Sequence, residues 1–333
     1  MDRILEVNDL HVHFSTYGGT VQAVRGVSFH LNRGETLAIV GESGCGKSVT
    51  SNAIMGLIPS PSGKIVNGSI LFKGEDLTKF PEKKMRTIRG VDISMIFQDP
   101  MTALNPTLTI GTQLMEGLIQ HKKVSAKEAE KRAIEMMELV GIPNPKERLK
   151  HYPHQFSGGM RQRIVIAIAL ICEPELLIAD EPTTALDVTI QAQILELFGE
   201  IQEKTGVSII LITHDLGVVA KIADRIAVMY AGKIIETGTK RDIFYRPQHP
   251  YTKGLLHSVP RLDERGELEP IDGTPPDLFS PPIGCPFTAR CPLAMEVCNK
   301  VYPATSSLSE THQVNCWLQD ERAKQLLAAA ASK

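Results

Sequence analysis

The sequence has no apolar run long enough to cross a bilayer. Its most apolar stretch, residues 164–172, falls far short of the roughly 18 residues that a membrane-spanning helix needs. The N-terminus, which reads MDRILEVNDL, also lacks the apolar core of a signal peptide. We therefore expect the chain to stay in the cytoplasm and to meet a membrane only through partner proteins.

An excess of charge of one sign is also missing. The 36 lysines and arginines are balanced by 38 aspartates and glutamates, which gives a formal net charge of -2. A nucleic-acid-binding domain is expected to carry a basic patch or stripe, so we do not expect a nucleic-acid partner. The hydrophobic fraction of 42% is ordinary for a globular protein and argues against wholesale disorder.

The short C-x-x-C pairs that are usual in structural zinc ribbons are absent as well. Four cysteines nevertheless gather late in the chain, and these are Cys285, Cys291, Cys298 and Cys316. In a reducing compartment such a group is more typical of a metal site than of a disulfide framework. Four thiolates suit either zinc or an iron–sulfur cluster, and the residues alone leave both of these and a metal-free site open.

The order of apolar runs predicts an α/β protein. Residues 3–72 alternate like short, half-buried antiparallel strands, except for a continuous apolar run at 36–40 that is typical of a buried strand. Apolar positions recur at helical spacing over 126–140, and later helices and strands alternate, which favours a mainly parallel sheet. The other expected elements are helices over 47–56, 158–170 and 190–205 and strands over 93–97, 176–180 and 208–213.

Changes in texture along the chain indicate two domains. Residues 1–245 carry the alternating strands and helices, and a helical insertion is expected within them over about 100–165. Prolines then interrupt any long element, so residues 246–333 are expected to form an extended arm that carries the four cysteines.

A glycine-rich loop follows the apolar run at 36–40. Residues 41–48 read GESGCGKS and fit the pattern G-x-x-x-x-G-K-[ST], in which backbone N–H groups turn toward phosphate oxygens. Lys47 can reach the β and γ phosphates of a nucleotide, and the Ser48 hydroxyl can ligate Mg²⁺. The predicted nucleotide contacts are Gly41, Ser43, Gly44, Cys45, Gly46, Lys47, Ser48 and Val49.

Two carboxylates end one of the apolar strands. Asp180 is placed to hold Mg²⁺, and Glu181 can polarise an attacking water as a general base. His214 ends another such strand and could sense the γ phosphate, because parallel strands bring their carboxyl ends to one edge. Gln98, after a further strand, could ligate Mg²⁺ or the water. These positions predict ATP hydrolysis, with Lys47, Glu181 and His214 as its catalytic residues.

A second glycine motif begins a predicted helix. Residues 156–160 read FSGGM and are followed by RQR, which resembles the signature of ABC ATPases, usually written LSGGQ. Ser157, Gly158 and Gly159 place bare N–H groups at a helix start, which makes a second anion-binding end. Phe156 and Met160 depart from the common pattern, and Met160 cannot make the hydrogen bonds of glutamine.

The resemblance to ABC ATPases rests on six motifs in family order and covers about residues 3–245. The remaining motif is a D-loop at 185–187. The resemblance implies a P-loop core with an antiparallel β subdomain and a helical insertion. It also implies a head-to-tail dimer, in which the signature of one subunit covers ATP held by the other. It therefore adds Asp187 to the nucleotide contacts, and Tyr17 lies where the family often has an aromatic residue stacking on adenine.

Several segments look like the ATPases of dipeptide and oligopeptide importers. These are VGESG at 40–44, FQDPMTALNP at 97–106, PQHPYTK at 247–253, and GCPF and RCP around the first two late cysteines. They resemble the D-type subunit, which implies an F-type ATPase paralogue, two membrane permeases and an extracytoplasmic solute-binding protein as partners. Nickel importers share much of this pattern and form the alternative.

The resemblance to D-type subunits also points to a [4Fe-4S] cluster at the four cysteines, with zinc as the alternative. Because these cysteines lie outside the nucleotide motifs, a structural role is favoured over a catalytic one. A soluble ABC ATPase acting on nucleic acid or ribosomes is a rival interpretation. It would need a basic surface or a long coiled-coil insertion, and the sequence has neither.

Overall fold

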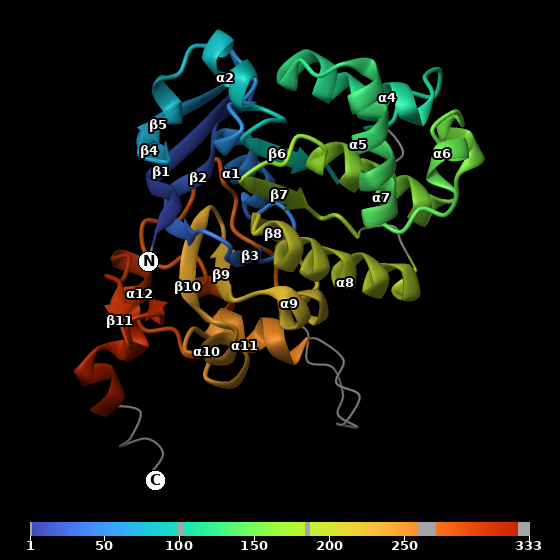
Figure 1. Ribbon diagram of the computed structural model, residues 1–333. Coiled ribbons are helices and arrows are strands. Elements are labelled where there is room, and N and C mark those ends of the chain that lie inside the picture. The colour runs from blue at the N-terminus through green and yellow to red at the C-terminus, as the bar shows by residue number, and fades with distance from the viewer. Residues whose placement is uncertain (1, 99–102, 184–186, 259–270, 326–333) are drawn as a thin grey trace.

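The computed structural model describes residues 2–98, 103–183, 187–258 and 271–325, which form two sheets, a group of helices and a C-terminal segment (Figure 1). The smaller sheet is antiparallel, with the strand order β2-β1-β4-β5. Its two long strands have 14 residues each, where the sequence predicted short ones, because register shifts bend the pair without ending it. The strands are β1 (Arg3–Thr16), β2 (Gly19–Asn32), β4 (Gly63–Phe72) and β5 (Glu75–Asp76).

The larger sheet has the strand order β11-β12-β10-β9-β3-β8-β7-β6. Strands β9, β3, β8, β7 and β6 run parallel, and β10 and β12 add to them in antiparallel fashion. The strands are β3 (Thr36–Val40), β6 (Ile93–Ile96), β7 (Leu176–Asp180), β8 (Ser208–Thr213), β9 (Arg225–Tyr230), β10 (Lys233–Thr239), β11 (Ser306–Ser307) and β12 (Gln313–Val314). Every residue of β3, β7 and β8 is buried, which confirms the strands predicted from continuous apolar runs.

Four helices lie next to strands of the two sheets in the sequence. They are α1 (Lys47–Ile54), α2 (Glu82–Ile88), α8 (Val188–Thr205) and α9 (Leu216–Ile222). Helix α1 ends two residues earlier than predicted, and α8 begins two residues earlier, because the Asp187 side chain caps it by accepting from Ile190 N. No helix within the described residues combines the length and apolarity that a bilayer span requires.

The predicted helical insertion forms a group of helices at one side of the larger sheet (Figure 1). It contains α4 (Ile110–Gly117), a π-helical turn (Leu118–Lys122), α5 (Ala126–Leu139), α6 (Pro145–Arg148) and α7 (Gly158–Leu170). Ser125 caps α5, whose Ala129, Ala133 and Met137 recur every four residues and are fully buried. Helix α7 has the predicted ends and packs into the same core.

The C-terminal segment is packed against the sheet. Its helices α11 (Pro250–His257) and α12 (Glu296–Lys300) are short, as the prolines predicted, and α10 (Lys240–Tyr245) comes just before the segment. Strand β12 pairs with β10 through Glu236 and Val314, so the chain returns to the sheet edge after the cysteines. Tyr230 of β9, Tyr251 and Phe287 share one buried cluster. The division into two domains at residue 245 stays a prediction.

Candidate nucleotide site and cysteine cluster

The glycine loop between β3 and α1 approaches two neighbouring strands so closely that side chains are excluded. Gly41 and Gly46 have φ angles of 152° and 102°. A Cβ at Gly41 would lie 2.1 Å from the carbonyl oxygen of Met229, and one at Gly46 would lie 2.4 Å from that of Ala23. The two glycines are therefore required by the backbone of the fold, and they leave the N–H groups of the loop free of side-chain cover.

Lys47 is buried at the start of α1 and bends back over this loop. Its Nζ donates to Gly41 O at 2.7 Å and to Glu42 O at 3.0 Å. Cys45 lies 3.8 Å from the same nitrogen, and burial raises the pKa of its thiol, which suits a small packing residue. Ser43 and Gly44 are exposed at the tip of the loop.

Ser48 connects the loop to the end of β7. Its Oγ donates to Asp180 Oδ1 at 3.0 Å. Burial raises the pKa of Asp180, and the hydrogen bond from Ser48 opposes that shift. A hydroxyl and a carboxylate that meet in this way are oxygen ligands of the kind that Mg²⁺ takes in proteins.

Glu181 is the meeting point of three neighbouring strand ends. Gln98, which follows β6, donates through Nε2 to Glu181 Oε2 at 3.1 Å, and His214 Nδ1, after β8, lies 3.2 Å from Oε1. Glu181 itself has a φ of 48°, a left-handed conformation that costs energy in a non-glycine residue and is found at functional sites. The structure thus brings together Gln98, Glu181 and His214, which the sequence singled out separately.

The signature residues lie at the start of α7, in the group of helices (Figure 1). Ser157 is exposed and caps the helix, with its Oγ accepting from Met160 N at 3.4 Å. A Cβ at Gly158 would meet no heavy atom within 4 Å, whereas one at Gly159 would lie 2.8 Å from Ile190 Cγ2 of α8. The open end of this 13-residue helix therefore presents its N–H groups to solvent.

The sequence predicts three further nucleotide contacts, at Tyr17, Val49 and Asp187. Tyr17 lies in the turn between β1 and β2, where its side chain is fully exposed. Val49 is half-buried in α1 and packs against the core of the smaller sheet. Asp187 caps α8, and the other two D-loop residues, Ala185 and Leu186, lie outside the described residues. The roles of these residues stay predictions.

The four late cysteines line one small cavity together with His249. All four are free, and Cys285 N donates to Cys298 O at 2.7 Å. Burial raises the pKa of Cys285 to about 11 and that of Cys316 to about 12, so these two thiols are protonated at neutral pH. Where the chain is described, no three His, Cys, Asp or Glu side chains are arranged closely enough to hold a metal ion. The metal therefore stays a prediction.

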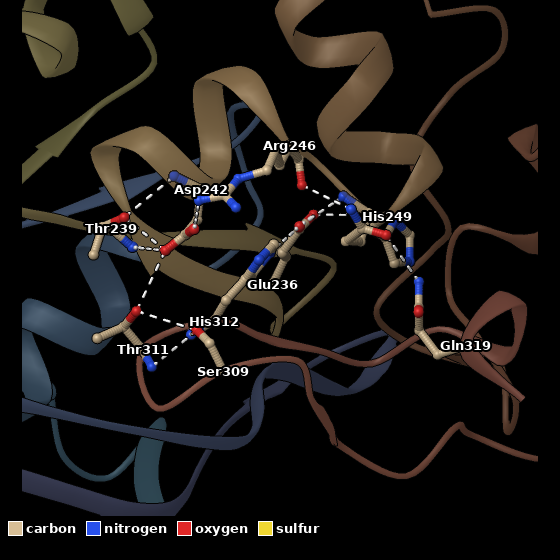
Figure 2. A network of polar contacts seen from close by, with 10 residues as sticks. Glu236, Thr239, Asp242, Arg246, His249, Ser309, Thr311, His312 and Gln319 are labelled. Carbon is tan, nitrogen blue, oxygen red and sulfur yellow. Dashed lines mark hydrogen bonds and ion pairs between the residues drawn. The ribbon is translucent and has the colours of Figure 1, made fainter.

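A buried polar network holds the wall of this cavity (Figure 2). Glu236 of β10 is fully buried and accepts from His249 N at 2.9 Å, and His312 Nε2 lies 2.8 Å from its other oxygen. His249 Nδ1 accepts from Tyr251 N at 3.0 Å, so its proton is on Nε2, which lies 4.0 Å from Cys285 Sγ. Burial lowers the pKa of His249 to about 3, which keeps the ring neutral.

Sequence reasoning missed the residues that join the two sites. Glu42 of the glycine loop accepts from Arg290 at 2.8 Å, and its N–H donates to the Tyr251 hydroxyl at 2.9 Å. Arg290 directly precedes Cys291, and Tyr251 lies within the PQHPYTK segment. Both therefore stood in segments that carried the resemblance to peptide importers, but nothing in the sequence indicated that they contact the loop.

The fold and this arrangement define a P-loop ATPase of the ABC class. Residues 24–184 match the family model described as ABC transporter, and residues 235–298 match that of the oligopeptide/dipeptide transporter C-terminal region. The dipeptide transport ATP-binding protein DppD of Bacillus subtilis (strain 168) is 71% identical over 100% of both chains. The chain therefore belongs to the family of ATP-binding subunits of dipeptide and oligopeptide ABC transporters.

Further similarities support the same family and fold. The oligopeptide transport ATP-binding protein OppD of Bacillus subtilis (strain 168) is 61% identical over 95% of this chain and 89% of its own. The solved dimeric ABC transporter cassette MJ0796 is 28% identical, with a TM-score of 0.64 over 71% of this chain and 99% of that one. The structure of cbiO1 from Clostridium perfringens is 31% identical, with a TM-score of 0.64 over 74% of this chain and 92% of that one.

Proposed function

We propose that this chain is the ATP-hydrolysing subunit of an importer for dipeptides or oligopeptides. The observation that carries the proposal is the contact of Gln98 and His214 with Glu181, beside the Ser48–Asp180 pair. All five lie at the carboxyl edge of the parallel strands, where ligands of such sheets bind. The names of the relatives and the match of the C-terminal region support a peptide cargo over nickel.

Each residue has a definite part in this proposal. The Lys47 ammonium neutralises charge that develops on the β and γ phosphates. Ser48, Asp180 and Gln98 would hold Mg²⁺, which supplies further neutralisation of the phosphate oxygens. Glu181 orients the attacking water for in-line displacement and takes its proton, while His214 holds the carboxylate in place from 3.2 Å.

The open end of α7 supports a nucleotide shared between two subunits. Ser157 and Gly158 offer N–H groups to an anion, but the glycine loop of the same chain already provides one phosphate cradle. A head-to-tail dimer gives the signature a function, because the signature then covers ATP that is bound to the loop of the neighbouring subunit. We assign the neighbour to an F-type paralogue, and MJ0796 is described as a dimer.

An apolar groove beside Gln98 supports contact with a membrane partner. It lies between the end of β6 and the helices α4 and α7, and its lining includes Leu104 and Ile168. Phe97, which also lines it, is 49% exposed. A permease segment seated here would be one residue from Gln98 and so would sense the nucleotide. The assembly would have two permeases and an extracytoplasmic solute-binding protein, with this chain peripheral on the cytoplasmic face of the membrane.

Reconstitution tests the function as a whole. The chain, its candidate ATPase partner and the two permeases would be placed in vesicles with the solute-binding protein. We expect a dipeptide to stimulate ATP hydrolysis and to accumulate, and the Lys47→Ala variant to do neither. Uptake of Ni²⁺ without peptide would favour the nickel importer instead. Stimulation by nucleic acid or ribosomes in the absence of permeases would favour a soluble ATPase.

We also propose that Cys285, Cys291, Cys298 and Cys316 hold a [4Fe-4S] cluster. The support is chemical, because four free thiols, one buried and three partly buried, line a single cavity and thiolates are the usual ligands of such clusters. When bound, the cluster supplies iron–thiolate bonds that link the ends of the C-terminal segment. Anaerobically purified protein should be brown, with absorbance at about 400 nm. A colourless protein that contains zinc would establish the alternative.

A further inference from the structure

The C-terminal segment holds the glycine loop from outside through two contacts with Glu42. The Arg290 guanidinium donates through Nη1 to Glu42 Oε2 at 2.8 Å, and the Glu42 N–H donates to the Tyr251 hydroxyl at 2.9 Å. One contact fixes the carboxylate and the other fixes the main chain. Arg290 and Glu42 are 248 residues apart in the chain, so this contact exists only in the folded protein.

Arg290 is held rigidly in place. Its Nε donates to Asp272 O at 2.8 Å, and its Nη2 donates to Ile271 O at 3.0 Å. The nitrogen that binds Glu42 also lies 3.1 Å from the Tyr230 hydroxyl. The side chain is only 6% exposed. A buried guanidinium with all three nitrogens engaged can hold one orientation, unlike the mobile arginines of a surface ion pair.

Charge gives this contact a consequence for nucleotide binding. Glu42 lies in the loop whose Lys47 and N–H groups would meet a triphosphate, and its carboxylate is 25% exposed. A carboxylate without a partner at this point would repel a polyanion, and salt would weaken this repulsion only in part because the site is partly buried. Arg290 cancels that charge at a distance of 2.8 Å.

The same contact reaches the cysteine cavity. Arg290 is followed by Cys291, and Tyr251 donates its own N–H to His249 Nδ1 at 3.0 Å. Cys291 and His249 both line the cavity. The wall of the cysteine cavity and the two groups that hold Glu42 are thus parts of the same short segments.

We propose that Arg290 is a positioning residue of the nucleotide site, which neutralises Glu42 and, with Tyr251, holds the loop in the form that accepts a triphosphate. The C-terminal segment then sets the affinity for ATP as well as the stability of the fold. The inference rests on the proposed binding of ATP at residues 41–48, but it does not depend on which metal the cysteines bind.

The first experiment compares the Michaelis constant for ATP in Arg290→Gln, Glu42→Gln and the double variant within the full transporter. Arg290→Gln should raise this KM roughly tenfold and change kcat by less than about twofold, because a lone carboxylate then faces the phosphates. Glu42→Gln should leave the KM at or below that of the parent protein, and adding it to Arg290→Gln should restore most of the affinity. The defect of Arg290→Gln should shrink as the salt concentration rises.

Arg225→Gln is the matched control. It breaks another buried ion pair, in which Arg225 contacts Glu35 at 2.9 Å, at the opposite end of β9 from the glycine loop. It should lower the melting temperature but leave the KM unchanged.

Three results would overturn the proposal. They are an unchanged KM in Arg290→Gln, a double variant as weak as Arg290→Gln, and a raised KM in Glu42→Gln. If Arg290→Gln fails to fold, the Glu42→Gln measurement and its salt dependence still decide the matter. A parent protein that hydrolyses no ATP, or that is indifferent to Lys47→Ala, would contradict the proposed function instead, before any of these comparisons is made.

Discussion

The nucleotide edge and the cysteine cavity are built in opposite ways. At the edge, polar side chains follow three neighbouring parallel strands, and the exposed Gln98 and His214 flank a partly buried Glu181. At the cavity, Cys285 is buried and the other three cysteines are partly buried, and Cys285 belongs to a buried cluster of apolar and aromatic residues. The edge has the form of a reaction site, and the cavity has the form of a structural centre.

The comparison predicts a division of effects. Substitutions at the nucleotide edge should change rates and leave folding nearly intact, because those side chains add little to the core. Substitutions around the cysteines should do the reverse. Arg290 is the exception, since it belongs to one region and acts on the other. The predictions below test this division, beginning with the largest effect.

Glu181→Gln should abolish most hydrolysis. Glutamine keeps the shape of the side chain but cannot accept a proton from water, so we expect a loss of roughly 10²–10⁴-fold in kcat with ATP binding retained. Phosphate release and nucleotide binding, measured on the same preparation, separate the two effects. The melting temperature should not change. An unaltered steady-state rate would remove Glu181 from its proposed role.

Gly158→Asp should reduce hydrolysis by about 100-fold. Its carboxylate would face, and repel, the ATP that is bound to the glycine loop of the neighbouring subunit. The chain itself has room for the substitution, since a Cβ here meets nothing within 4 Å. Gly199→Asp in α8 is the matched control, because that glycine is also unobstructed, and it should retain activity. Equal activity of the two variants would contradict the shared site.

Cys316→Ser should remove the metal and lower the melting temperature by about 5–10 °C, since an incomplete ligand set cannot hold the C-terminal segment together. Iron analysis and thermal unfolding measure the two outcomes. Cys172→Ser serves as the comparison, because Cys172 is also a free thiol but is buried in the core next to the end of α7. It should cost stability without any loss of iron. Full iron in Cys316→Ser would refute the ligand assignment.

Thr239→Ala should have the smallest effect, a loss of about 0.5–2 kcal/mol in unfolding free energy. Thr239 caps α10 and exchanges hydrogen bonds with Asp242, at 3.2 Å from N and 2.6 Å to Oδ2 (Figure 2). Denaturant unfolding would measure the change, and the KM for ATP should stay the same. A raised KM for ATP in Thr239→Ala would show that the division between the two regions is incomplete.

Much of the nucleotide edge could be predicted because short sequence segments determine where its strands end. Continuous apolar runs ended by polar residues placed β3, β7 and β8 with their observed ends, and the rule that parallel strands share an edge placed Glu181 near His214. The nucleotide roles of the individual residues remain predictions, whereas the ABC fold is confirmed by solved relatives.

The C-terminal contacts could not be predicted in the same way. Strands β11 and β12 have two residues each, too few to show any periodicity. The partner of Arg290 lies at the far end of the chain, and a charged residue in a sequence does not indicate which opposite charge it will meet. The cysteine positions predicted a shared metal site, which stays a prediction although the four cysteines line one cavity, and the sequence does not specify the ion.

The pairing of β12 with β10 has a consequence for the solubility of the protein. Strand β10 is the last long strand on its side of the larger sheet, and β12 occupies its outer backbone groups at Glu236 and Thr237. An uncovered strand at that position is a template on which further chains can add by β-sheet pairing. Pairing with β12 therefore protects this edge against aggregation, and a chain truncated before β12 would be prone to self-association even with an intact ATP site.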